Sequence, residues 1–363
     1  MKFNLMHRCA IHLSRSREKW EETMKAVKLA LLGTLVAMPG AALADELNLI
    51  CSADVVICEK LVNEFEASHS DIDVNMIRLS SGEAYAKVRA EARNPQTDLW
   101  WGGTGDPHLQ AGQDGLSAQY KSPMLDQLQD WAKGQAEVSD FHTVGVYSGA
   151  LGWGYNKEIF EKKGIEPPKC WADLLDPALK GEVQIADPNS SGTAYTALAT
   201  LVQLMGEDEA FDFLKKMHAN VSQYTKSGSA PVKAAARGET GLGIVFQHDA
   251  VSQAVSGFPI GVVAPCEGTG YEIGSMSLIE GAQNPEAART FYDWVLTAEV
   301  QSLMPEAGSF QIPSNANATP PKEAPDLSTI KLIDYDFAEY GDADRRKALL
   351  ARWDEEVGSL PVQ

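Results

Sequence analysis

The sequence has no run of apolar residues close to the ~20 that a membrane-spanning helix requires. Its clearest apolar run, residues 29–38, is far shorter and follows two lysines. The small-residue motif at 42–44 comes next, and this order of basic, apolar and small residues is typical of a secretory signal peptide. We predict that residues 1–44 are a leader with its true start at Met24 and cleavage after Ala44. The rest of the chain is then expected to be a soluble periplasmic protein.

Basic residues are scarce relative to acidic ones. The chain has 31 Lys and Arg against 50 Asp and Glu, a formal net charge of −19. Proteins that bind nucleic acid need a basic surface, because contacts to phosphate dominate their affinity. We therefore expect no nucleic-acid partner. The acidic excess is typical of a solvated surface, so an anionic ligand would have to be held by local groups against an unfavourable overall field.

The sequence also lacks the common motifs of catalysis and metal binding. Its seven histidines form no HxxxH or HExxH spacing, and no DxDxDG calcium loop occurs. No GxSxG sequence is present to hold a nucleophilic serine. We expect a binding protein with no cofactor and no resident metal. A secreted phosphate-ester hydrolase is the alternative from another functional class.

Four cysteines follow the predicted leader, in a compartment where disulfides persist. Their spacing fits neither a zinc ribbon nor a redox CxxC motif. Cys51 is predicted to end the first strand and Cys58 to lie in the next helix, close enough to pair. Cys170 with Cys266 is a further candidate pair, but four cysteines allow three connectivities, so the sequence leaves the disulfide state open.

Apolar residues alternate between strand spacing and helix spacing, without internal repeats or low-complexity tracts. The alternation runs from residue 47 to 102 and again from 182 to 264. It predicts an α/β fold with parallel strands, whose ligands gather at the carboxyl ends of the strands. The glycine-bearing stretch 143–155 is predicted to connect the two series. The expected division is a first lobe at 45–145, a second lobe at 146–266, and a return to the first lobe with C-terminal helices at 267–363.

Three short runs of serine and glycine each follow a predicted strand and precede a predicted helix: Ser80-Ser81-Gly82, Ser190-Ser191-Gly192-Thr193 and Ser227-Gly228-Ser229. At a helix start the first N–H groups have no internal partner and the macrodipole is positive, so an anion can bind there. One run alone is an ordinary cap, and Ser80 with Glu83 has capping-box spacing. Thr104 is a fourth residue of this kind. Together they predict an anion site, provided that the N–H groups of Ser81 and Gly82 stay free.

Polar side chains at two other places are candidates to bind a ligand. Gln247-His248-Asp249 follows a predicted strand, and Glu272 lies in the glycine-flanked segment 268–274. Such a set is open to three interpretations: metal ligands, acid/base catalysts, or hydrogen-bond partners for hydroxyl groups. Trp100 and Trp101 fit either the floor of a ligand pocket, where aromatic faces suit sugar rings, or the core.

Five motifs occur in a recognisable order: DLWWGGT (98–104), GWGYN (152–156), WADLLD (171–176), ADPNSSGT (186–193) and ARGETGLG (236–243). This set resembles the bilobed solute-binding proteins of ABC importers, specifically the ferric-iron-binding (type II) class. The resemblance covers nearly all of the chain after the leader. It implies two lobes, each a central mostly parallel sheet flanked by helices, with the ligand in the cleft between them. It also implies delivery of the ligand to a membrane permease by a monomer that catalyses no reaction.

Iron-binding members typically use adjacent tyrosines, and no two tyrosines are adjacent in this sequence. The presence of His248, Asp249 and Glu272 instead is similar to the hexose-phosphate-binding branch, in which such residues take the sugar hydroxyls. The phosphate would then be held by Ser80, Ser81, Thr104, Ser191, Gly192 and Thr193, while Ser227 and Ser229 stay unassigned. We expect amides and hydroxyls to suffice there, without a cationic side chain. Ferric iron or another metal, and aminoethylphosphonate or another small phosphoryl compound, stay as alternatives.

Overall fold

The structure, a computed structural model, describes residues 45–362. The predicted leader, the start at Met24 and the cleavage site after Ala44 lie outside the described residues. Within residues 45–362 the longest helices are too short or too polar to cross a bilayer.

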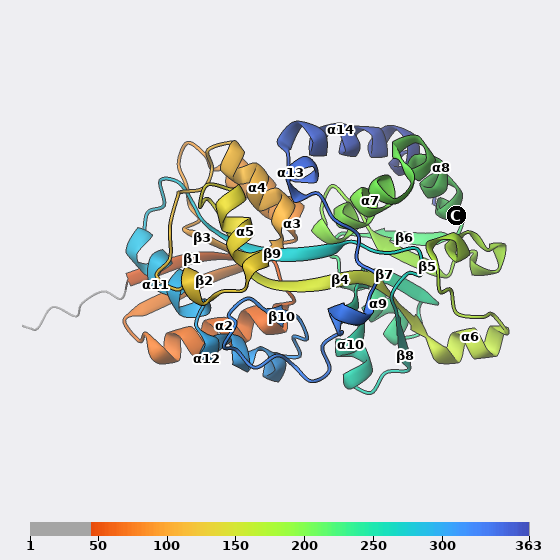
Figure 1. Cartoon of the computed structure of the whole chain (residues 1–363), viewed down its shortest axis with the longest axis horizontal. Coiled ribbons are helices and arrows are strands. Elements are labelled where there is room, and N and C mark those ends of the chain that lie inside the picture. The colour runs from red at the N-terminus through yellow and green to blue at the C-terminus, as the bar shows by residue number, and fades with distance from the viewer. Residues whose placement is uncertain (1–44, 363) are drawn as a thin grey trace, which may run out of the picture. The chain divides into compact units, whose positions relative to one another are not determined.

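A mixed sheet with the strand order β2-β1-β3-β9-β4-β7-β5-β6 forms the centre of the described chain, and β8 and β10 also pair with β4 (Figure 1). The strands are β1 (Asp45–Cys51), β2 (Ile72–Arg78), β3 (Leu99–Thr104), β4 (Val144–Asn156), β5 (Val183–Ala186), β6 (Val221–Thr225), β7 (Leu242–Phe246), β8 (Ile260–Val263), β9 (Tyr271–Leu278) and β10 (Ile312–Pro313).

Helices connect these strands and cover the sheet. They are α2 (Val55–Ser68), α3 (Ser81–Ala90), α4 (Gly105–Gln113), α5 (Asp130–Val138), α6 (Lys157–Lys163), α7 (Gly192–Met205), α8 (Glu207–His218), α9 (Ala230–Ala236), α10 (Gln247–Val255), α11 (Pro285–Val295), α12 (Ala298–Leu303), α13 (Phe337–Tyr340) and α14 (Ala343–Trp353). Strands and helices occur together in both regions where the sequence predicts them, 47–102 and 182–264.

The pairing of the strands follows from how the chain connects them. Strands joined by a helix are parallel, as the alternation predicts: β1 pairs with β2 and β3, and β5 pairs with β6 and β7. The two long strands β4 and β9 instead run antiparallel to each other and to their neighbours β7 and β3. The sheet is therefore parallel toward its two ends and antiparallel in the middle, where β4 and β9 link one half to the other.

The two largest hydrophobic cores of the described chain lie on this sheet. Strand β4 contributes to both, with Val144 and Val146 in the first core and Leu151 and Trp153 in the second. Burial of such large side chains is the main source of folding energy for each half. The C-terminal helices pack into the second core, through Tyr340, Leu349, Trp353 and Val357. The boundaries given above for the two lobes stay a prediction.

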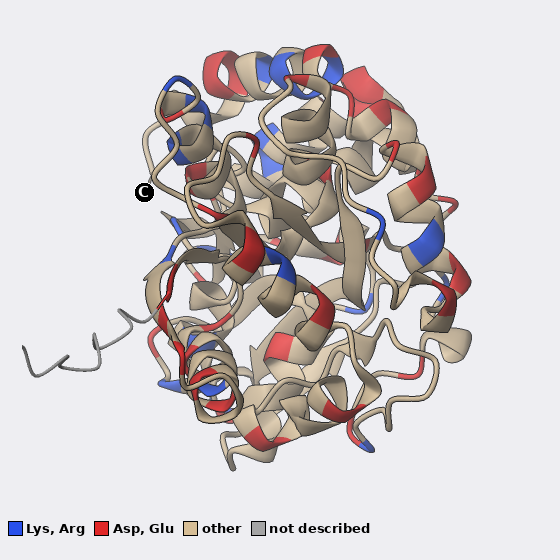
Figure 2. Cartoon of the chain, turned by 90° about the vertical axis from the view of Figure 1, so that its left-hand side faces the viewer, with Lys and Arg blue, Asp and Glu red and all other residues tan. Residues whose placement is uncertain are grey.

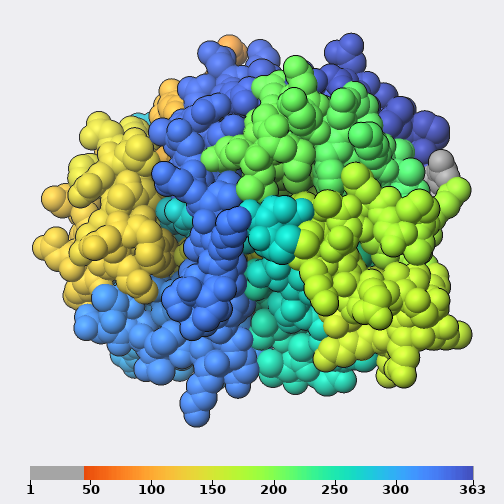
Figure 3. Space-filling view, turned by 45° about the vertical axis from the view of Figure 1, so that its right-hand side comes forward, coloured from red at the N-terminus to blue at the C-terminus, as the bar shows by residue number. Residues whose placement is uncertain are grey.

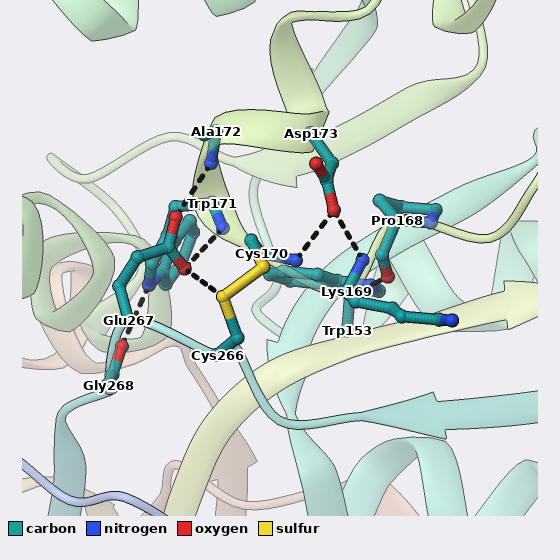
Figure 4. Close-up of a disulfide and its surroundings, with 10 residues drawn as sticks. All are labelled: Trp153, Pro168, Lys169, Cys170, Trp171, Ala172, Asp173, Cys266, Glu267 and Gly268. Carbon is teal, nitrogen blue, oxygen red and sulfur yellow. Dashed lines mark hydrogen bonds between the residues drawn. A yellow bond between two sulfur atoms is a disulfide. The ribbon is translucent and has the colours of Figure 1, made fainter.

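Both candidate cysteine pairs are present as disulfides, Cys51–Cys58 and Cys170–Cys266. The second pair ties the short helical turn Trp171–Leu175 to the segment before β9 (Figure 4). Glu267, next to Cys266, accepts hydrogen bonds from the backbone N–H groups of Trp171 and Ala172 at 2.8 and 2.9 Å. These contacts fix the chain that leaves the second half just before it enters β9.

Candidate functional site

One pocket gathers the residues that the sequence analysis singled out. It encloses about 480 Å³ of empty space, with the solvent at its mouth included. All nine predicted site residues line it: Ser80, Ser81, Thr104, Ser191, Gly192, Thr193, His248, Asp249 and Glu272. Further lining residues that the sequence analysis missed are Ser52, Asp54, Arg78, Gly103, Tyr147, Phe246 and Gln311.

Three helices begin at one end of this pocket. Ser80, Thr104 and Ser191 are the N-cap residues of α3, α4 and α7, so the positive ends of three macrodipoles meet there. The Ser81 hydroxyl accepts the Thr104 N–H at 3.2 Å, which ties α3 to the start of α4. Thr104 Oγ1 is buried and has no hydrogen-bond partner within residues 45–362. A buried hydroxyl without a partner is costly, so Thr104 Oγ1 is a candidate atom for binding a ligand in the pocket that this residue lines.

Gly192 allows the start of α7 to lie close to the starts of α3 and α4. A Cβ atom on Gly192 would lie 2.0 Å from Thr104 Oγ1 and 2.9 Å from Ser81 Oγ. Real Cβ atoms do not come this near to other atoms, so any larger residue would push α7 away from α3 and α4. The glycine of this run therefore brings hydroxyl groups from separate segments of the chain to one place.

One condition set for this end of the pocket is not met, and one open alternative is decided. The Gly82 N–H is not free, because it donates to the carbonyl of Ser190 at 2.9 Å. Trp100 and Trp101 do not form the pocket floor: both are buried, and Trp100 stacks on His108 with ring centres 3.7 Å apart. The apolar run that contains the tryptophans is a core strand, which the sequence analysis had left open.

Arg78 is the cation that the sequence analysis did not expect. All three of its guanidinium nitrogens are used: Nε donates to the Ala53 carbonyl at 3.0 Å, Nη1 to Ser80 Oγ at 3.1 Å and Nη2 to Ser227 Oγ at 3.2 Å. Among the described residues that line the pocket, it is the one Lys or Arg. The expectation that amides and hydroxyls act without a cationic side chain is therefore not met. Its position at the end of β2, two residues before Ser80, is the signal that could have found it.

His248, Asp249 and Glu272 lie together at the other end of the pocket. His248 Nε2 is 3.8 Å from Asp249 Oδ1 and 3.7 Å from Glu272 Oε1. His248 and Asp249 open α10 directly after β7, as expected, whereas Glu272 lies within β9 opposite Gly149 rather than in a glycine-rich loop. Gln311 comes from the chain after α12 and places its Nε2 3.3 Å from His248 Nε2.

Burial keeps these three side chains toward their uncharged forms. It raises the pKa of Asp249 to about 7 and that of Glu272 well above its usual value, and lowers the pKa of His248 to about 3. The negative charge of Asp249 adds to the rise of the Glu272 pKa. Uncharged carboxyl groups and imidazole both donate and accept hydrogen bonds, which matches what a hydroxyl group offers.

The sequence model of one protein family, the bacterial extracellular solute-binding proteins, matches residues 105–340. The chain belongs to this family. An uncharacterized protein from Haemophilus influenzae is 47% identical over 342 residues, which cover 93% of this chain and 99% of that protein. The periplasmic binding protein AfuA from Actinobacillus pleuropneumoniae, solved with exogenous fructose 6-phosphate bound, is 47% identical. It matches with a TM-score of 0.84 over 87% of this chain and 99% of its own.

Iron-binding members of the same fold are more distant. Iron-bound HitA from Pseudomonas aeruginosa is 17% identical with a TM-score of 0.71, over 85% of this chain and 99% of its own, which shows a shared fold only. The chain is thus a solute-binding protein of an ABC importer with the two-lobed type II fold. This confirms the fold and the resemblance inferred from the sequence.

The alternative that this solute-binding protein binds a metal ion has little support in the described chain. Among residues 45–362, the one group with metal-ligand spacing is Cys170, Cys266 and Glu267 (Figure 4). The two cysteines form a disulfide, so neither offers a thiolate, and both oxygens of Glu267 already accept backbone N–H groups. In the cartoon of Figure 2, positions of acidic and basic residues alternate along several of the helices in view.

Proposed function

We propose that this solute-binding protein captures a hexose phosphate in the periplasm and delivers it to its membrane permease. The observation that carries the proposal is the division of one pocket into two chemically different ends. Three helix N-termini, five hydroxyl-bearing side chains and Arg78 form one group of lining residues, and His248, Asp249 and Glu272 form the other. AfuA, which was solved with fructose 6-phosphate, adds support through its 47% identity.

The first end fits a phosphate monoester. Such a group carries nearly two negative charges near neutral pH, and preoriented amides, hydroxyls and a guanidinium hold it without reorganisation. Thr104 Oγ1, which has no partner within the described chain, supplies a donor or acceptor for a phosphate oxygen. Arg78 also offsets the repulsion between an acidic chain and an anion, because it places one positive charge next to the bound anion.

The second end fits the hydroxyl groups of a sugar. The pocket walls come from both lobes, with Ser80 and Thr104 on one side and Thr193 and His248 on the other. A ligand that contacts both sides stabilises the arrangement in which they face each other. We propose that this closed form is what the permease recognises, and that the protein acts as a monomer.

Calorimetry and thermal unfolding test the proposal. We expect glucose 6-phosphate and fructose 6-phosphate to bind one to one and to stabilise the protein, by about 2.7 kcal/mol at 100 times the dissociation constant. Glucose and inorganic phosphate, each of which fills one end only, should bind at least about 100-fold more weakly. Size-exclusion chromatography with light scattering would check the monomer.

Three outcomes would refute the proposal. Release of free phosphate from the sugar phosphates would show an esterase, and colour with stoichiometric iron in the purified protein would show an iron carrier. Tighter binding of 2-aminoethylphosphonate than of any hexose phosphate would show a phosphonate carrier. A native mass spectrum of protein purified without refolding would reveal which cargo the protein retains.

A further inference from the structure

Residues 309–313 reach the pocket from a distant part of the sequence. Figure 3 shows the chain after α12 as a band between the segments near residue 140 and those near residue 260. Strand β10 pairs with β4, with Ile312 opposite Ser148 and Pro313 opposite Tyr147. This pairing fixes the residue before it, Gln311, at the pocket wall. Gln311 and Ser309 are both buried.

The amide of Gln311 is held in one orientation. The Ser309 hydroxyl donates to Gln311 Oε1 at 2.6 Å. The opposite side of the amide, Nε2, can only donate, and it lies 3.3 Å from His248 Nε2. His248 Nε2 must then accept, and a neutral imidazole that accepts at one nitrogen carries its proton on the other.

His248 Nδ1 is therefore a donor, and it has no acceptor within residues 45–362. Leaving a buried donor unpaired destabilises the folded protein. The backbone next to Nδ1 belongs to Gly149, where a Cβ would lie 2.4 Å from Nδ1 and 3.7 Å from Glu272 Oε1. Gly149 pairs with Glu272 across β4 and β9, so the His248 ring packs over Gly149 on the same face of the sheet as Glu272.

We propose that Gln311, oriented by Ser309, is a positioning residue that selects the ligand through His248. It holds the imidazole as the Nδ1–H tautomer, which donates to a hydroxyl oxygen of the ligand beside Glu272. This inference rests on the proposed function for the nature of the ligand. It adds that the site accepts an oxygen at this position and disfavours an ammonium group, which offers only donors.

Nitrogen-15 NMR of the ligand-free protein reads the tautomer directly. We expect His248 to show a protonated Nδ1 and an unprotonated Nε2, with its signals assigned by their loss in His248→Asn. In Gln311→Glu a carboxylate accepts at Nε2, so the spectrum should change to the Nε2–H tautomer. Ser309→Ala, which frees the amide to turn, should give a mixture of both forms.

Binding provides the second measurement. Gln311→Met should weaken glucose 6-phosphate about tenfold, as expected for one misplaced hydrogen bond, and leave inorganic phosphate within about twofold. Gln311→Glu should lower the preference for glucose 6-phosphate over 2-aminoethylphosphonate. Gln301→Met is the matched control, because Gln301 is also buried and hydrogen-bonded but makes no hydrogen bond to His248 within the described residues. It should lower stability without changing the tautomer.

An unprotonated His248 Nδ1 in the wild type would overturn the inference, and so would a Gln311→Met protein with the wild-type tautomer and ligand preference. These results are separate from a failure of the proposed function. If no hexose phosphate binds, the proposed function is wrong, whereas the ligand-free spectrum still decides the tautomer.

Discussion

Gly82 offers a test of closure that does not touch the ligand. It lies in the first turn of α3, does not line the pocket, and donates its N–H to the Ser190 carbonyl across the two sides of the site. A Cβ at this position would lie 2.1 Å from the carbonyl oxygen of Asn189. We predict that Gly82→Ala weakens ligand binding although every ligand contact is kept.

The size of the effect on binding follows from two free-energy changes, one in the form with the two sides apart and one in the closed form. In a form with the two sides apart, alanine improves a helix position by about 0.5–1 kcal/mol over glycine. In the closed form, the backbone at Asn189 has to retreat by more than 1 Å to reach an ordinary contact, and the 2.9 Å hydrogen bond to Ser190 is lost. The lost bond alone is worth about 0.5–1.5 kcal/mol, before any strain. We therefore expect at least about tenfold weaker binding with no loss of ligand-free stability.

Calorimetry with glucose 6-phosphate and thermal unfolding without ligand measure the two quantities. Gly134→Ala is the matched control, because Gly134 lies inside α5 and a Cβ there would meet open space. It should stabilise the protein and leave the affinity unchanged. Wild-type affinity in Gly82→Ala would refute the reasoning, and so would equal weakening in both variants.

Four further predictions concern the pocket itself. Ser81→Ala with Thr193→Ala should weaken every phosphorylated ligand by a similar factor, at least about 100-fold by calorimetry, because both hydroxyls face the anion end. Glu272→Ala should change the ranking among hexose phosphates, and an unchanged ranking would contradict its assignment to the sugar. Arg78→Met should weaken sugar phosphates about 10- to 100-fold and reduce the salt dependence of binding, whereas Arg78→Lys should recover only part of the affinity. Because burial raises the pKa of Asp249 from 3.8 to about 7, the folded state binds more protons than the unfolded state between those values. The Asp249 contribution to the stability of the ligand-free protein should therefore fall as pH rises from about 4 to 7. His248, whose pKa burial lowers to about 3, acts in the opposite sense, so the measured quantity is the unfolding free energy of the wild type minus that of Asp249→Asn, which should decrease over this range.

The parts of the site that could be predicted from sequence are those encoded by neighbouring residues. A serine or threonine after a strand and before a helix marks an N-cap, so Ser80, Thr104 and Ser191 could be placed at helix starts from local pattern alone. The parallel strands that carry them follow from strand and helix alternation. His248 and Asp249 could be found in the same way, since they directly follow β7.

The missed features depend on contacts between residues far apart in the chain. Arg78 is a functional candidate because it meets Ser227, 149 residues away, and Gln311 because it meets His248, 63 residues away. Glycine near Glu272 suggested a loop, yet a Cβ on Gly274 would lie 1.9 Å from the Tyr147 ring. That glycine serves close packing of β9 on β4, and local pattern does not distinguish this use from a turn.

Charge placement explains how an acidic chain can hold a dianion between carboxyl groups. If Asp249 and Glu272 were both ionised, they would repel a phosphate group in the same pocket and each other. Burial raises the pKa of each and so holds both carboxyl groups toward the uncharged form, in which we propose that they donate and accept hydrogen bonds with the sugar. Arg78 then supplies the positive charge next to the anion, and its three hydrogen bonds fix the orientation of the guanidinium. The pKa shifts of the carboxyl groups and the strength of the Arg78 contact would both depend on water being excluded when the two sides of the pocket meet. For this reason we expect Gly82, which lies outside the pocket but between the two sides, to affect the affinity.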